Sequence, residues 1–171
     1  MLSHLVIALG AALALPLNAM PPASAASQAT ADFVAIVRRA EIDRPAAQAW
    51  RRAGGFCAVA KWLPVSCALQ SGSGGLGSIR LINGSILEVM VANSPDSYSY
   101  WQIKGPMAAS GYHGTVAIVP DGPRKSTVIY TLVYNQNAFS TPAERSAQRE
   151  RLTKRFQGAC DAIRKIAEVQ P

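Results

Sequence analysis

The C-terminal part of the chain carries a long apolar stripe at helical spacing. Thr141 and Glu144, with Pro142 between them, match a capping box that begins a helix. Apolar side chains then recur at Leu152, Phe156, Ala159, Cys160, Ile163, Ile166 and Ala167. Basic side chains fill other positions at Arg145, Arg149, Arg155, Arg164 and Lys165. Such a helix has to bury its apolar side against another layer, which limits the folds open to this chain.

The middle of the chain predicts strands separated by turn residues. Asn83-Gly84 is a strong hairpin signal, because both residues tolerate positive φ. We expect strands at 33–42, 66–70, 78–82, 86–92, 98–104, 112–119 and 127–134. We expect two short helices after the first strand, at 46–53 and 56–63, and a turn at 120–123. The short links favour an antiparallel sheet, which has to curl around the C-terminal helix to form an α+β domain.

The N-terminus indicates export. An apolar run from Leu2 to Leu17 precedes Ala23 and Ala25, the small-x-small pattern that a signal peptidase needs. An N-terminal anchor is the alternative, but the run is shorter than the ~20 residues that span a bilayer. We therefore expect a signal peptide at 1–25, a flexible tail at 26–31 and one domain at 32–171. The mature protein would be periplasmic or secreted, with no integral membrane segment.

The charge of the chain bounds its partners. The formal net charge is +7, and none of it lies in the leader. A cationic surface of this kind favours weak contact with anionic surfaces. Nucleic-acid binding is not expected, because the basic residues form no recognisable module with stacking aromatics. No cofactor or metal is expected either: His113 is the only histidine after the leader, and no ligand spacing surrounds it.

Three cysteines remain in the mature chain, and two of them are expected to pair in an oxidising compartment. A bridge from Cys57 to Cys67 would close a short loop and stabilise the fold by roughly 2–3 kcal/mol. Cys160 would then be a small buried residue of the helix. Pairing of Cys57 with Cys160 is the alternative that the sequence leaves open.

Three segments, taken in order, resemble motifs of the helix-grip superfamily (SRPBCC). They are I-D-R-P-A-A-Q-A-W at 42–50, G-F-C through W-L-P at 55–64, and the glycine-rich stretch 72–80. The superfamily includes START domains, birch-pollen-type plant allergens and bacterial polyketide cyclase/dehydrase-like proteins, and the bacterial branch is the most similar. The resemblance implies a curved seven-stranded antiparallel sheet wrapped around the long C-terminal helix, with two short helices after the first strand.

The same resemblance implies a cavity between the sheet and the helix, where family members bind lipids, hormones or polyketides. Glu88 and Tyr112 match pocket positions of the related plant hormone receptors. Val65 replaces the receptors' pocket lysine, so recognition of that hormone is not expected. The residues expected to contact a ligand are Trp62, Arg80, Glu88, Tyr100, Gln102, Tyr112, Tyr130 and Phe156.

Glu88 is the candidate catalytic residue. Period-two geometry places Ile86, Glu88 and Met90 on one face of a strand, where burial would raise the pKa of the carboxyl group. The alternative is a carboxylate paired with Arg80 of the neighbouring strand. Three functions follow: a carrier of a small hydrophobic molecule, a cyclase or dehydratase that uses Glu88 and a pocket tyrosine, or a domain whose basic helix face docks an acidic protein or membrane. We favour the carrier.

Tyrosines concentrate on one face of the predicted sheet. Tyr98 and Tyr100 share strand parity, and so do Tyr130 and Tyr134, so each pair points to one face. Trp101 has the opposite parity and is expected to face outward. A tyrosine combines apolar area with one hydrogen-bonding tip, which suits either a pocket or the core under the helix.

Overall fold

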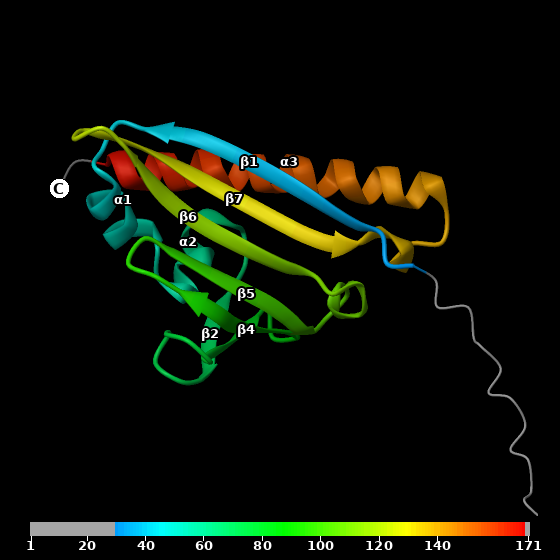
Figure 1. Cartoon of the computed structure of the whole chain (residues 1–171). Coiled ribbons are helices and arrows are strands. Elements are labelled where there is room, and N and C mark those ends of the chain that lie inside the picture. Colours follow the sequence, from blue (N-terminus) through cyan, green and yellow to red (C-terminus); the bar gives the residue numbers. More distant parts are fainter. Residues whose placement is uncertain (1–29, 170–171) are drawn as a thin grey trace, which may run out of the picture.

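A computed structural model describes residues 30–169 of the chain. The signal peptide expected at 1–25 and the first residues of the expected tail lie outside the described residues. Figure 1 shows a curved sheet with a long helix packed along it and two short helices near one end. The expected α+β helix-grip architecture is thereby confirmed.

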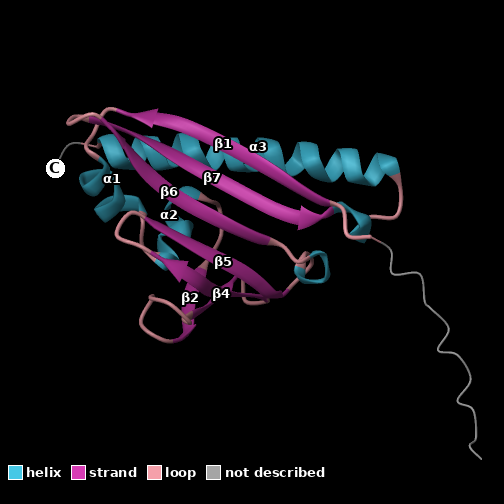
Figure 2. Ribbon diagram, in the orientation of Figure 1, coloured by secondary structure: helices cyan, strands magenta, loops and turns pink. Residues whose placement is uncertain are grey.

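Seven strands form one antiparallel sheet in the spatial order β1-β7-β6-β5-β4-β3-β2. The strands are β1 (Phe33–Ile42), β2 (Cys67–Ser71), β3 (Ile79–Ile82), β4 (Ile86–Asn93), β5 (Ser97–Lys104), β6 (His113–Asp121) and β7 (Lys125–Asn135). The helices are α1 (Ala46–Ala53), α2 (Val59–Trp62) and α3 (Pro142–Glu168). Single 3₁₀ turns are η1 (Phe56–Ala58), η2 (Ala108–Ser110) and η3 (Gln136–Ala138). Strands β2 to β7 follow one another as a meander, and β1 joins at β7 (Figure 2).

The strand expected to end before a turn at 120–123 continues to Asp121, which corrects that expectation. Pro120 pairs with Ser126 of β7, and it has no partner in β5, whose first residue, Ser97, pairs with Ala117. A proline cannot donate to a ladder, so it is tolerated where a strand has a neighbour on one side only. The turn itself occupies residues 122–124.

Helix α3 begins with the capping box that the sequence predicts. The Thr141 side chain accepts a hydrogen bond from the Glu144 backbone N–H, and the Glu144 side chain accepts one from the Thr141 N–H. The helix packs on β1 and β7 and touches α1 and α2 (Figure 1). It packs mainly on β1 and β7, and Trp50 of α1 and Phe56 of η1 cover part of the inner face of the far strands by packing on Tyr98 of β5.

Strand β4 is irregular in its pairing with β5. Its pairing with β5 shifts between Leu87 and Glu88 and again between Met90 and Ala92. Such bulges bend a strand and increase its twist. Strands β2 and β4 therefore lie well away from α3 in Figure 1. This divergence makes room between α3 and the far half of the sheet.

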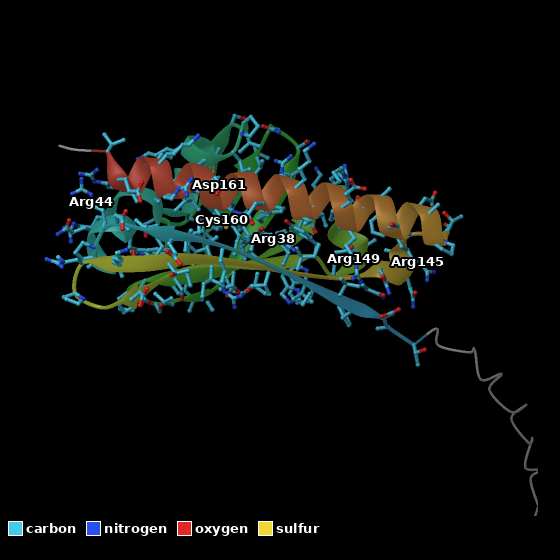
Figure 3. All side chains as sticks on the ribbon, turned by 90° about the horizontal axis from the view of Figure 1, so that it is seen from above. Arg38, Arg44, Arg145, Arg149, Cys160 and Asp161 are labelled. Atoms are coloured by element: carbon cyan, nitrogen blue, oxygen red, sulfur yellow. A yellow bond between two sulfur atoms is a disulfide. The ribbon has the colours of Figure 1, made fainter. Side chains whose placement is uncertain are left out.

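The cysteines are arranged as the first of the two expected pairings. Cys57 and Cys67 form a disulfide that ties η1 to the start of β2. Cys160 carries a free thiol and is fully buried. Figure 3 shows Cys160 on the side of α3 that faces the sheet, near Arg38 of β1. Within residues 30–169, none of the helices combines the length and apolar character needed to cross a membrane.

Candidate functional site

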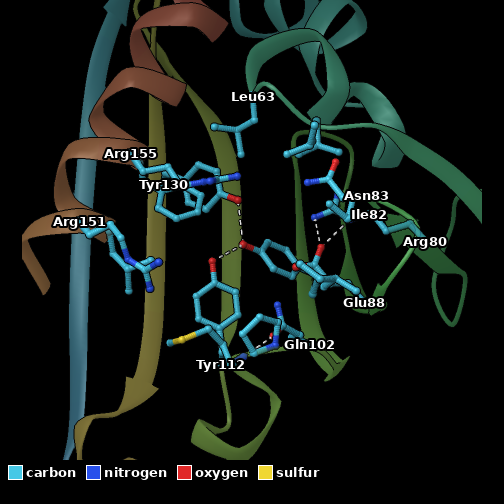
Figure 4. A pocket seen from close by; sticks show the side chains of 18 of the residues that line it. Leu63, Arg80, Ile82, Asn83, Glu88, Gln102, Tyr112, Tyr130, Arg151 and Arg155 are labelled. Carbon is cyan, nitrogen blue, oxygen red and sulfur yellow. Dashed lines mark hydrogen bonds and ion pairs between the residues drawn. The ribbon is translucent and has the colours of Figure 1, made fainter. Parts of the chain in front are cut away.

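A cavity of about 270 Å³ lies between α3 and strands β3, β4 and β5 (Figure 4). Apolar side chains form part of its wall, among them Leu63, Ile82, Leu152 and Phe156. Small-molecule pockets in proteins usually start near ~300 Å³. The cavity therefore has room for one compact molecule rather than for a two-chain lipid.

Arg80 and Glu88 form a buried ion pair on the β3–β4 side of the cavity. They are direct cross-strand neighbours, so their side chains point to the same face of the sheet. Arg80 Nε donates to Glu88 Oε2 at 2.8 Å, and Arg80 Nη2 lies 2.7 Å from the same oxygen. The residues are only 1% and 7% exposed. This pairing with Arg80 is the alternative that the sequence analysis set against a catalytic Glu88.

The Arg80 guanidinium has further partners on its other side. Its Nη1 donates to the Phe56 backbone carbonyl at 2.5 Å and to the Tyr98 hydroxyl at 3.3 Å. Its central carbon lies 4.3 Å from the Phe56 ring centroid and 4.7 Å from that of Tyr100, in cation–π range. Burial by itself would lower the pKa of Arg80, but Tyr98 and Glu88 raise that pKa above its ordinary value. Arg80 is therefore a permanent cation.

Three tyrosine hydroxyls meet in the middle of the cavity wall. The Tyr100 hydroxyl lies 2.9 Å from that of Tyr130 and 3.2 Å from that of Tyr112 (Figure 4). Burial raises the pKa of each of the three above the ordinary tyrosine value, so all stay protonated near neutral pH. Three hydroxyl protons serve two mutual hydrogen bonds. At least one O–H is therefore left to donate to a ligand.

Gln102 lines the cavity and also holds the loop between β5 and β6. Its Oε1 accepts the Met107 backbone N–H at 2.7 Å. Gln148 of α3 donates through Nε2 to the Met107 sulfur at 3.1 Å. This loop is thereby tied to β5 on one side and to α3 on the other. The two contacts fix one end of the cavity.

All of the expected contact residues line the cavity except Trp62. Trp62 is 4% exposed, donates through Nε1 to the Ala53 carbonyl, and packs edge-on against the Tyr130 ring. Phe156 contacts Tyr130 from α3, with ring centroids 4.6 Å apart. Trp62 thus supports a wall residue from behind, which corrects its expected place on the wall itself.

Among the other aromatic residues, Tyr98 and Tyr134 are buried in the core, and Trp101 is 45% exposed on the opposite side of the sheet. The outward orientation expected for Trp101 is confirmed. His113, the one histidine among residues 30–169, stacks on Trp101, with ring centroids 5.7 Å apart. No group of three side chains that could hold a metal ion occurs within the described residues.

Sequence reasoning missed three polar side chains of α3 that line the cavity: Gln148, Arg151 and Arg155. Arg155 was assigned to the basic outer side of the helix. Arg151 and Arg155 directly precede Leu152 and Phe156, which point inward, so they flank the apolar stripe. Their positions next to inward-pointing residues could have indicated that they lie near the cavity. Whether such flanking side chains reach a cavity depends on how far α3 lies from strands β3, β4 and β5.

A curved antiparallel sheet, a long helix along one side of it and an internal pocket between them define a helix-grip domain of the ligand-binding type. The chain belongs to the family described as polyketide cyclase / dehydrase and lipid transport, whose model matches residues 34–168. A search of curated proteins finds no significant match.

Solved structures share the fold. A protein from Nitrosospira multiformis is 20% identical, with a TM-score of 0.63 over 77% of this chain and 94% of that chain. XoxI from Bacillus cereus is 18% identical, with a TM-score of 0.64 over 77% and 93%. Truncated norcoclaurine synthase from Thalictrum flavum is 19% identical, with a TM-score of 0.61 over 84% and 99%. Identities this low show a common fold and nothing further.

Proposed function

We propose that this protein is an exported binding protein that holds one small, mostly apolar molecule between the sheet and α3. The observation that carries the proposal is the cavity, whose apolar walls surround a few buried polar groups. This combination is typical of ligand pockets, because apolar burial supplies affinity and a few polar groups supply orientation. Apolar burial contributes about 25 cal/mol per Å².

Export is part of the same proposal. We assign residues 1–25 to a signal peptide, 26–31 to a tail and 32–171 to the binding domain. The disulfide between Cys57 and Cys67 supports an oxidising location, since such bridges are rare in the cytosol. We therefore propose that the mature protein acts in the periplasm or in the extracellular medium.

A binding role suits the polar groups better than acid–base catalysis does. Glu88 takes both bonds from Arg80 on Oε2, so its charge is already neutralised by a buried cation. The cavity tyrosines hold their protons because burial raises the pKa of each, which makes them hydrogen-bond donors rather than bases. Glu88 and the tyrosines therefore orient a ligand, and the cyclase or dehydratase alternative has less support.

A neutral fluorescent probe tests the pocket. N-phenyl-1-naphthylamine brightens in apolar surroundings and should bind the mature protein saturably, one molecule per chain. Val65→Trp places a large ring on the cavity wall and should abolish this binding. Val37→Trp makes the same change on an exposed position of β1 and should leave binding intact. Absence of saturable binding, or equal binding by all three proteins, would overturn the proposal.

The natural ligand can be sought directly. Native mass spectrometry of the mature protein, purified after export from the cells that make it, should show a bound small molecule that is released on denaturation. Val65→Trp purified in the same way should lack it. A molecule that is retained by wild type but chemically converted during incubation would instead support the enzyme alternative, and Glu88→Gln would then separate binding from turnover.

A further inference from the structure

Two arginines of α3 stand at the cavity without an acidic partner. Arg151 and Arg155 both line it, are exposed to solvent, and extend from α3 toward it in Figure 4. Within residues 30–169, neither has a carboxylate close enough for an ion pair. Arg151 hydrogen-bonds only the neutral amide oxygen of Gln148. Because both side chains line the cavity and are also exposed, they lie at its mouth, where no carboxylate compensates their positive charge.

The spacing of the two arginines along α3 also favours an anion between them. They are four residues apart on one helix, so they are neighbours on the same face. Like charges at this spacing repel each other and destabilise a helix slightly. An anion placed between them would remove that repulsion and gain charge-assisted hydrogen bonds from both guanidinium groups. Nothing within the described residues supplies such an anion.

The charges around the cavity are unbalanced. The charged residues of its wall are three arginines and one glutamate. Arg80 and Glu88 neutralise each other in their buried pair, which leaves a net positive charge from Arg151 and Arg155. The field of Arg155 extends inward: burial raises the pKa of Tyr112, and the positive charge of Arg155 partly opposes that rise. A molecule in the cavity therefore meets a cationic mouth.

We propose that the ligand is a compact amphiphile with a single acidic group, whose apolar body fills the cavity and whose acid lies between Arg151 and Arg155. This inference rests on the proposed binding function and names the class of its ligand. The unused tyrosine O–H and the Glu88 Oε1 atom, which has no hydrogen-bond partner within the described residues, orient the inner end.

Two probes that differ by one acidic group test the inference. 1-Anilinonaphthalene-8-sulfonate carries a sulfonate on the same aromatic skeleton as the neutral N-phenyl-1-naphthylamine. We expect wild type to bind the sulfonate about tenfold more tightly, a preference that two charge-assisted contacts readily supply. Arg151→Gln with Arg155→Gln should remove this preference by weakening binding of the sulfonate about tenfold more than binding of the neutral probe.

A charge-matched variant separates the two arginines from the general field of the helix. Lys154 and Arg164 are also on α3 but do not line the cavity. Lys154→Gln with Arg164→Gln removes the same number of charges and should keep the preference for the sulfonate. Raising the salt concentration should weaken binding of the sulfonate and leave binding of the neutral probe nearly the same, because salt screens exposed charges.

The outcomes distinguish the two proposals. Failure of both probes to bind wild type overturns the binding function itself. Binding of the neutral probe without a preference for the sulfonate leaves that function standing and overturns the inference. An equal loss of the sulfonate preference in the two double variants also overturns the inference, because it would show that the general charge of the helix attracts the sulfonate. Loss of binding of the neutral probe when Arg151 and Arg155 are replaced overturns it too, because it would show that the two arginines have a purely structural role.

Discussion

Arg80 and Glu88 face each other across β3 and β4, and their charged groups meet at 2.7 Å in the wall of the cavity. A buried pair of this kind adds little net stability, because the desolvation of two charges offsets their attraction. Removal of one partner is far more costly, because it leaves the other charge buried alone. The pair therefore constrains which substitutions this wall tolerates.

Arg80→Met should lower the free energy of unfolding by about 3–5 kcal/mol. The change leaves the Glu88 carboxylate unpaired and removes the donor to the Phe56 carbonyl. Urea unfolding followed by circular dichroism measures the effect. The double variant Arg80→Met with Glu88→Leu should recover much of the loss, since no isolated charge remains. A double variant as unstable as the sum of the two single changes would contradict the prediction.

Gly114→Ala should disturb the tyrosine cluster. A Cβ at this position would lie 2.6 Å from the Tyr100 hydroxyl oxygen, and Tyr100 is 1% exposed with little room to move. We expect a loss of about 1–3 kcal/mol in the free energy of unfolding and weaker binding of N-phenyl-1-naphthylamine.

Gly158→Ala is the matched control for that substitution. Gly158 lies in α3, and a Cβ there meets no atom within 4 Å. Alanine is the better helix former, so this change should stabilise the protein by roughly 0.5–1 kcal/mol. Equal effects of the two substitutions would argue against crowding at Tyr100.

The tyrosines should make the protein sensitive to alkali. All five tyrosines of the chain are buried, and burial raises the pKa of Tyr100 and Tyr130 well above the ordinary value. A raised pKa in the folded state contributes stability that is fully present below the unfolded pKa of about 10. That contribution is lost as the pH rises toward the folded pKa, because the unfolded chain ionises first.

Absorbance at 295 nm measures this ionisation. The native protein should show little tyrosinate signal above pH 10 until it unfolds, and then the signal should rise together with the loss of circular dichroism. Melting temperatures should fall over the same range of pH. Gradual ionisation of a folded protein near pH 10 would contradict the burial of the cluster.

Cys160 should be inert in the folded protein. Burial raises the pKa of its thiol to about 12, so almost no reactive thiolate exists at pH 8. A thiol reagent such as Ellman's reagent should detect no thiol in the native protein and one per chain in guanidinium. Peptide mapping should find the Cys57–Cys67 bridge. A Cys57–Cys160 bridge in the map would contradict the structure.

Several features of the fold could be predicted from local patterns. The bounds of β1 and α1, the capping box at Thr141 and the inward parity of Tyr100 follow from nearest neighbours along the chain. The sequence predicted that Arg80 and Glu88 lie on neighbouring strands, because Asn83-Gly84 is a hairpin signal. It left two roles open for Glu88, an ion pair with Arg80 and catalysis. The choice between that pair and a catalytic carboxylate needed the actual distance between the side chains.

Local sequence thus determined the elements, their faces and the alternation of buried and exposed side chains, since periodicity acts over a few residues. The tertiary structure alone decided where α3 lies on the sheet, because packing against β1, β7 and α1 sums contacts between residues distant in sequence. That placement makes the space lined by Arg80 and Glu88 a cavity, brings Arg151 and Arg155 to its mouth, and leaves Trp62 behind its wall.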